Sequence, residues 1–481
     1  MKNKLMDRRA FLRKTSFLLS GLGFGSTLQF EAHGDLFKKL FSRAEAAQLP
    51  SRPNYSLEIL APGGFPLTDM FPSPGMKRVD TGKYFNFYGD HREFLQNGNL
   101  WYSWAARDIG KYAPYIAVSE GVREVNVHIP VPATRMGGVV MLPGQVVPSR
   151  APASPSILFA HKTPSNTVLP GINFSPDLDI HSLNGMQNFP FLRNRLNYLE
   201  LFRQPALSFS VSEILQITDA VRNLNEKLGQ EMSKRLSKVE DAKLSSKQGA
   251  FFLTTDFRGA AAQDLNWVDG QRRLRYAVPK ADPGDRFNVD PELGEMLKLT
   301  FVGFKNALFK SSMIFLSSGD WHSRVRLEYG NLQTRLMEYF VANMVDFLDL
   351  LSETPDPNGL PGETLFDNTI ISLNSEFGRN ARTFWGHDNS HGGKAFFVFI
   401  GKRVKGGTYG DVQLHPDALP NNNLDRILGF DYETGATIEK TVEPVDVYAT
   451  HCSLLGIPST VLAEQGVTAR RISAICRDPA A

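Results

Sequence analysis

Two histidines and an aspartate lie within five residues of one glycine-flanked loop, at His387, Asp388 and His391. Glycine permits tight backbone turns, so side chains that are close in sequence can converge on one point. Imidazole and carboxylate ligands suit zinc, manganese or iron, and calcium where oxygen ligands dominate. The sequence predicts a divalent-metal site with Asp388 and His391 as ligands and leaves His387 open. A solvated loop is the alternative.

A second pair of possible ligands, Asp320 and His322, directly follows the apolar run 313–316. Alternate residues of an extended segment point the same way, so both side chains could reach one metal ion. The alternative is a structural aspartate and a hydrogen-bonded histidine.

A third segment ends an apolar run with Glu376 and Arg379. Glu376 could bind a metal or act as an acid or base, and Arg379 could bind an anionic oxygen group through its planar guanidinium. We predict catalytic roles for both residues. An internal ion pair between them is the alternative.

Short apolar runs that recur along the chain are expected to form the buried strands of a largely parallel sheet in an α/β fold. They lie at 57–60, 157–160, 251–253, 313–316, 369–373 and 396–400. Helices are expected at 212–245 and 332–351, where apolar residues recur at steps of three and four. Open sheets of this type bind ligands at the carboxyl ends of their strands, where the three segments above are expected.

The N-terminal 46 residues have the pattern of a twin-arginine export signal. Arg8 and Arg9 precede Phe11-Leu12, and an apolar stretch follows at 15–30. Ala44-Glu45-Ala46 fits a cleavage site best, and Ala32-His33-Gly34 is the alternative. The stretch is too short and polar for a stable membrane span. We expect recognition by the twin-arginine translocase and a periplasmic or secreted mature protein.

Removal of residues 1–46 would take nine of the 53 basic and four of the 50 acidic residues. The remaining charges nearly balance, which provides no electrostatic footprint for nucleic acid. In an oxidising compartment Cys452 and Cys476 could form a disulfide; two buried free thiols are the alternative.

The segment 366–379, FDNTIISLNSEFGR, resembles the "domain of unknown function 1501" family of twin-arginine-exported bacterial proteins, within the alkaline phosphatase and sulfatase superfamily. The segment 63–75 resembles the family's opening motif and aligns Asp69 with its aspartate. GDWHS, GHDNSH and the segments 400–412 and 442–457 resemble further family motifs in the same order.

The resemblance implies a three-layer α/β sandwich with a mixed, mostly parallel sheet, formed by one domain over 47–481 with a helical insertion around 205–247. It also implies hydrolysis of small-molecule or polymer esters of phosphate or sulfate. The metal ligands implied are Asp69, Asp320, His322, Glu376, Asp388 and His391.

One position departs from the pattern of metal-dependent relatives, in which this strand ends in Ser-Asp-His-Gly. Here the residues are Ser375-Glu376-Phe377-Gly378, and Phe377 cannot bind a metal. No nucleophile can be matched among Thr68, Ser73 and Thr81. A non-catalytic periplasmic binding or assembly protein on the same scaffold is therefore the alternative to a hydrolase. A redox protein is a third class, but it lacks a cofactor fingerprint.

Overall fold

The computed structural model describes most of residues 53–477, in separate ranges. These ranges are 53–61, 70–75, 94–123, 153–163, 169–174, 194–200, 255–276, 293–316, 330–375, 378–379, 391–392, 394–413 and 426–477, with residues 167, 189 and 192. They fall almost entirely in one compact unit, made of Arg52–Leu201 and Gly259–Ala481. The predicted export signal and the predicted helix at 212–245 lie outside the described residues.

A seven-stranded sheet forms the middle layer of this unit, with the strand order β11-β4-β10-β7-β1-β6-β5. Within the described residues, β10 alone runs antiparallel to its neighbours, so the sheet is mixed and mostly parallel, as predicted. The strands are β1 (Tyr55–Ala61), β4 (Ile116–Arg123), β5 (Leu169–Asn173), β6 (Phe309–Phe315), β7 (Thr369–Ser375), β10 (Lys394–Ile400) and β11 (Gly407–Tyr409).

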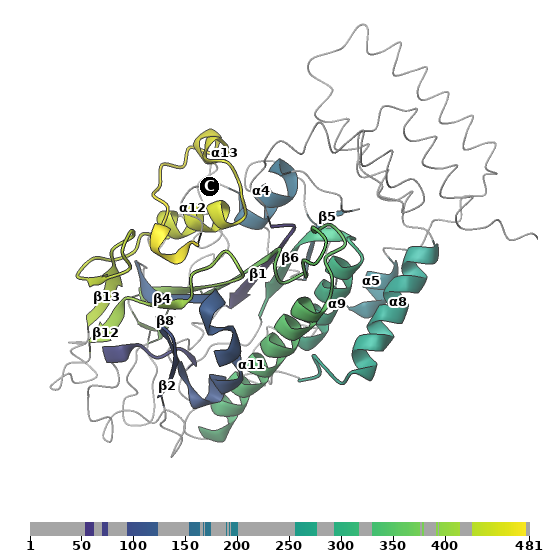
Figure 1. Cartoon of the computed structure of the whole chain (residues 1–481), viewed down its shortest axis with the longest axis horizontal. Coiled ribbons are helices and arrows are strands. Elements are labelled where there is room, and N and C mark those ends of the chain that lie inside the picture. The colour runs from purple at the N-terminus through teal and green to yellow at the C-terminus, as the bar shows by residue number, and fades with distance from the viewer. Residues whose placement is uncertain are drawn as a thin grey trace, which may run out of the picture. The chain divides into compact units, whose positions relative to one another are not determined.

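Helices cover both faces of this sheet, which gives the predicted three-layer α/β sandwich (Figure 1). On β1, Ser56 bonds to Ser156 of α4 (Pro155–Lys162), with 3.1 Å between the hydroxyl oxygens. The next side chain back, Tyr55, stacks on Phe304 of α9 (Leu293–Lys305) with ring centroids 4.7 Å apart. Because neighbouring residues of a strand point to opposite faces, α4 and α9 lie on opposite sides of the sheet.

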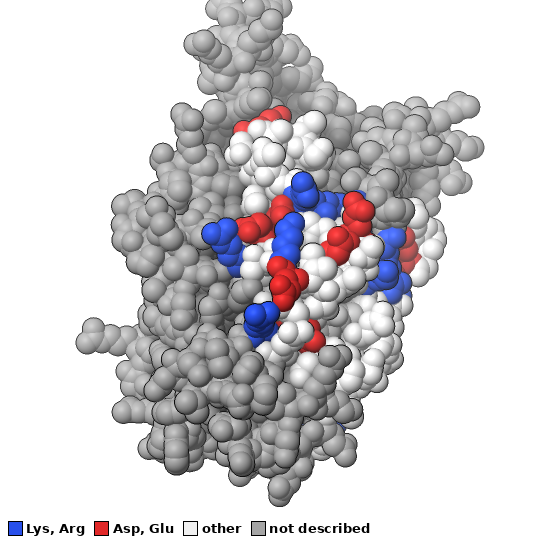
Figure 2. All heavy atoms as spheres, turned by 90° about the vertical axis from the view of Figure 1, so that its left-hand side faces the viewer, with Lys and Arg blue, Asp and Glu red and all other residues white. Residues whose placement is uncertain are grey.

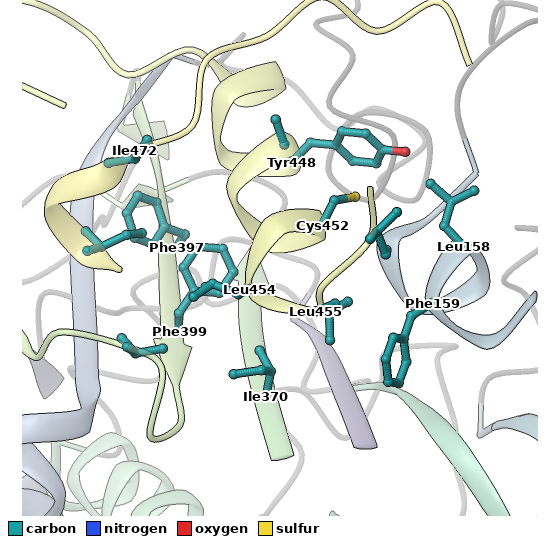
Figure 3. Packing of buried hydrophobic residues seen from close by; sticks show 14 of the residues in the cluster. Leu158, Phe159, Ile370, Phe397, Phe399, Tyr448, Cys452, Leu454, Leu455 and Ile472 are labelled. Carbon is teal, nitrogen blue, oxygen red and sulfur yellow. The ribbon is translucent and has the colours of Figure 1, made fainter. Parts of the chain in front are cut away.

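Two further helices complete these outer layers. Helix α12 (Pro444–Leu454) packs beside α4, and α11 (Gly330–Glu353) packs beside α9. On the face covered by α4 and α12, apolar side chains of the sheet and of these two helices form one continuous buried cluster (Figure 3). Its labelled members include Phe159, Ile370, Phe399, Cys452 and Leu455.

The remaining described elements lie around this sandwich. They are β2 (Phe94–Asn97), β3 (Leu100–Ser103), the 3-10 helix η4 (Trp104–Tyr115), α5 (Arg195–Glu200), α8 (Thr255–Gly270), β8 (Gly378–Arg379), β9 (His391–Gly392), β12 (Asp411–Gln413), β13 (Arg426–Phe430), β14 (Thr437–Ile438), α13 (Ser459–Glu464) and η7 (Ser473–Ile475).

Most of the sequence-based assignments are confirmed. The runs at 57–60, 369–373 and 396–400 are strands, the run at 313–316 contains the end of β6, and the helix predicted at 332–351 lies within α11. The run at 251–253 lies outside the described residues.

The strand predicted at 157–160 is wrong, because these residues form the middle of α4. Ser154 caps this helix, its hydroxyl accepting a hydrogen bond from the backbone N–H of Ile157, and Pro155 occupies the first turn, where proline is tolerated. Residues 155–160 are all buried, so the run has no polar face to show a helical period.

The two cysteines are free thiols, and both are buried. Of the two states the sequence left open, the structure therefore contains the unpaired one. None of the described helices combines the length and the hydropathy needed to cross a membrane.

Candidate functional site

Three adjacent parallel strands end together at one edge of the sheet. In the pairing register, Leu60 of β1 lies opposite Phe315 of β6, and Ala61 of β1 lies opposite Ser375 of β7. These are the last residues of the three strands or next to the last. The chain segments that leave β1, β6 and β7 therefore start from neighbouring points on the carboxyl edge, where α/β sheets bind ligands.

The antiparallel strand β10 starts at this same edge. Phe397 of β10 pairs with Asn374 near the end of β7, and Ile400 pairs with Ile371 further back. The first residue of β10, Lys394, therefore lies toward the carboxyl end of β7. The histidine-rich loop that precedes β10 consequently enters the sheet where the other three segments leave it.

Two of the predicted site residues lie opposite each other in a short ladder next to this edge. Strands β8 and β9 pair antiparallel, with Arg379 opposite His391 and Gly378 opposite Gly392. Because the two strands pair in this register, Arg379 and His391 are direct cross-strand neighbours.

The other predicted site residues lie outside the described residues. They are Asp69, Asp320, His322, Glu376, His387 and Asp388. Among the residues that are described, no three His, Cys, Asp or Glu side chains gather closely enough to hold a metal ion.

The segment that follows Asp69 is anchored beside β12. The backbone N–H of Val412 donates to the Ser73 hydroxyl at 2.8 Å, and the N–H of Gly75 donates to the Asp411 carboxylate at 2.6 Å. Ser73 is buried, so this candidate nucleophile has a structural hydrogen-bonding role. A side chain at Gly75 would lie 2.3 Å from the Val412 carbonyl oxygen, which explains the glycine. Thr68 and Thr81 lie outside the described residues.

A buried carboxyl group, Glu58, was not among the predicted functional residues. It lies in the middle of β1 on the α4 and α12 face and is 1% exposed. Burial raises its pKa to about 7, and the nearby hydroxyl and backbone N–H of Ser156 only partly offset that effect. Neither carboxyl oxygen makes a well-formed hydrogen bond to any described residue. The signal in the sequence was a single charge inside the apolar run 57–60.

Acidic and basic side chains are interleaved on the described part of the face shown in Figure 2. An even mixture of signs does not attract polyanions strongly, because the fields of neighbouring charges cancel over short distances.

No protein-family model matches this chain, and no curated protein matches it in sequence. Among solved structures, it is similar to the PsFucS1 sulfatase from Pseudoalteromonas sp., at 11% identity and a TM-score of 0.37 over 94% of this chain and 77% of the sulfatase. It is also similar to a protein in the alkaline phosphatase superfamily from Vibrio parahaemolyticus, at 9% identity and a TM-score of 0.31 over 88% and 90% of the two chains. These scores do not assign an activity to the chain.

Proposed function

We propose that this chain is an exported, metal-dependent hydrolase of phosphate or sulfate esters. One observation supports the proposal above others: β1, β6 and β7 end, and β10 begins, at one edge of the sheet. Each of the four adjoining segments carries residues that can bind a metal or an anion, although they are far apart in the sequence.

The proposed metal site combines carboxylate and imidazole ligands from all four segments. This donor set fits zinc, manganese or iron, and fits calcium if the carboxylates dominate. When bound, a divalent metal polarises the ester and lowers the pKa of a coordinated hydroxyl or water. The proposed ligands are Asp69, Asp320, His322, Glu376, Asp388 and His391, with His387 as an additional candidate.

Arg379 is the proposed anion-binding residue. A guanidinium group binds two oxygens of a phosphate or sulfate group at once and stays charged at any physiological pH. The β8–β9 register supports this role, since it makes Arg379 the backbone neighbour of the proposed ligand His391. Glu376 is proposed either to bind the metal or to transfer a proton.

Export and domain organisation belong to the same proposal. We infer a twin-arginine signal at 1–46, one mature domain at 47–481 with a helical insertion around 205–247, and membership of the domain of unknown function 1501 family. The periplasmic or secreted chain would act on a small-molecule or polymer ester.

A second candidate is a non-catalytic periplasmic binding or assembly protein on the same scaffold. Two observations favour it. In the sequence, Phe377 stands where the resemblance implies a metal-binding residue, and the Ser73 hydroxyl accepts a hydrogen bond from a backbone N–H at 2.8 Å.

Elemental analysis of the mature protein, purified without a histidine tag, distinguishes the two candidates. We expect about one equivalent of divalent metal or more in the wild type, and its loss when Asp320→Ala and His391→Ala are combined. The matched control combines Asp108→Ala with His161→Ala, which removes the same two residue types from exposed positions.

The control variant is expected to retain its metal and the double variant to remain folded. The metal-containing protein is then expected to hydrolyse a nitrophenyl phosphate or nitrophenyl sulfate. A folded wild type that contains no metal would contradict the hydrolase and favour the binding protein.

A further inference from the structure

Several buried polar groups without hydrogen-bond partners lie in the layer between the sheet and α12. Among the described residues, such groups include both carboxyl oxygens of Glu58, the Ser372 hydroxyl, and His451 Nε2 of α12. A buried polar group with no partner costs free energy, so this layer is held together less firmly than a purely apolar one.

The register places Glu58 and Ser372 side by side on the sheet, and a ring contact connects His451 of α12 to the next residue in the same row. Glu58 of β1 lies opposite Ser372 of β7, and Ser372 lies opposite Phe399 of β10. The imidazole of His451 packs against the Phe399 ring, with centroids 5.3 Å apart. Helix α12 therefore lies over a row that begins with an unpartnered carboxyl and ends beneath an unpartnered imidazole.

None of the described side chains that face Glu58 carries a positive charge. Helix α12 presents the Cys452 thiol and the Tyr448 phenol, and α4 presents Ser156. The Tyr448 hydroxyl donates to the Ala153 carbonyl at 2.9 Å. These neighbours are neutral, so they can accommodate a protonated carboxyl far better than a carboxylate.

The remaining neighbours do not change this balance. On β6, the residue opposite Glu58 is Met313. The buried lysine of that strand, Lys310, bonds to Thr163 at the end of α4, and its ammonium lies 4.0 Å from the centre of the Phe159 ring. On α4, Lys162 pairs with Glu464.

We propose that loss of the Glu58 proton to solvent loosens α12 from the sheet, which makes this layer a pH-sensitive element of the fold. The negative charge left behind can be hydrated only if the layer opens and admits water. Burial raises the pKa of Glu58 to about 7 and lowers that of His451 to about 3. Between these values both groups are neutral, and only Glu58 changes its charge near neutral pH. The proposal does not depend on the proposed hydrolase function.

Cys452 provides a reporter within the layer, because its thiol is fully buried beside Glu58. In a full-length Cys476→Ser background, the rate of its reaction with a disulfide reagent would be measured at about pH 5.5 and about pH 8, with Glu58 and with Glu58→Gln. Thiolate formation speeds labelling in both proteins. At each pH, the rate for the protein with Glu58 is divided by the rate for the Glu58→Gln protein. This ratio isolates the contribution of the Glu58 charge.

This ratio is expected to rise about tenfold or more between the two pH values, since each pKa unit corresponds to a tenfold change in the opening equilibrium. An unchanged ratio would overturn the proposal.

Hydrogen exchange of the Cys476→Ser protein tests the proposal without the Glu58 variant. Exchange of residues 444–454 of α12 is expected to accelerate with pH more than exchange of residues 337–351 of α11, which lies on the opposite face of the sheet. Equal acceleration of the two helices, after correction for intrinsic exchange, would contradict a local opening.

Discussion

Replacing Glu58 with glutamine is expected to change the free energy of unfolding more favourably at pH 8 than at pH 4. The expected difference between the two changes is about 3 kcal/mol. The folded state raises the pKa of Glu58 from its ordinary 4.5 to about 7 because the carboxyl is buried without a cation beside it. The folded chain thus holds this proton more tightly than the unfolded chain does. The corresponding stability is fully present below about pH 4.5 and is lost as the pH rises to about 7.

The measurement is the free energy of unfolding in urea for both proteins across this range of pH. The other titrating groups are shared, so their contributions cancel in the difference between the proteins. His451 is one of these groups. Burial lowers its pKa from the ordinary value of 6.5, so His451 makes the protein less stable as the pH falls below 6.5, which is the opposite direction to Glu58. A difference that does not vary with pH would show that Glu58 is not held neutral in the fold.

Replacing Gly303 with alanine is expected to lower the free energy of unfolding by about 2 kcal/mol, despite the better helix propensity of alanine. The added methyl carbon would lie 2.0 Å from Cζ of the Phe309 ring. Phe309 is fully buried and packs edge-on against Phe304, so its ring cannot move without displacing the core between α9 and β6. Overpacking of this kind commonly costs between about 1 and 3 kcal/mol.

Gly259 in α8 offers a matched control, since it is also helical but has no atom within 4 Å of an added methyl. Gly259→Ala is expected to raise stability by about 0.5 to 1 kcal/mol through helix propensity alone. Urea denaturation of the two variants separates the steric effect at Gly303 from the backbone effect that they share. Stabilisation by both substitutions would mean that the contact between α9 and Phe309 is looser than described.

The parts of the fold that the sequence predicted well are those with strong local patterns. The strands at β1, β7 and β10 are short apolar runs between polar or glycine-rich segments, and α11 shows a clear apolar stripe. The apolar run in α4 resembles a strand because this helix is buried against both the sheet and α12 and so has no polar face. Its start was nevertheless marked by Ser154 and Pro155.

The candidate site could be predicted only in part for a different reason. Local sequence indicates which residues follow a strand, so Asp320, Glu376 and His391 could be proposed as ligands. It does not indicate strand order. The position of β1 between β6 and β7 depends on pairing between distant segments, and this order is what brings the strand ends together. Glu58 was overlooked because an isolated charge in an apolar run does not reveal whether it is buried.

The most direct test of the proposed function is a crystal of the mature protein soaked with manganese and measured for anomalous scattering. The account predicts an anomalous peak at the carboxyl edge of the sheet, beside the ends of β1, β6 and β7 and the β8–β9 ladder, with Asp320 and His391 among its ligands. A metal bound elsewhere, or an edge at which Asp69, Asp320 and His391 point to separate surfaces, would contradict it.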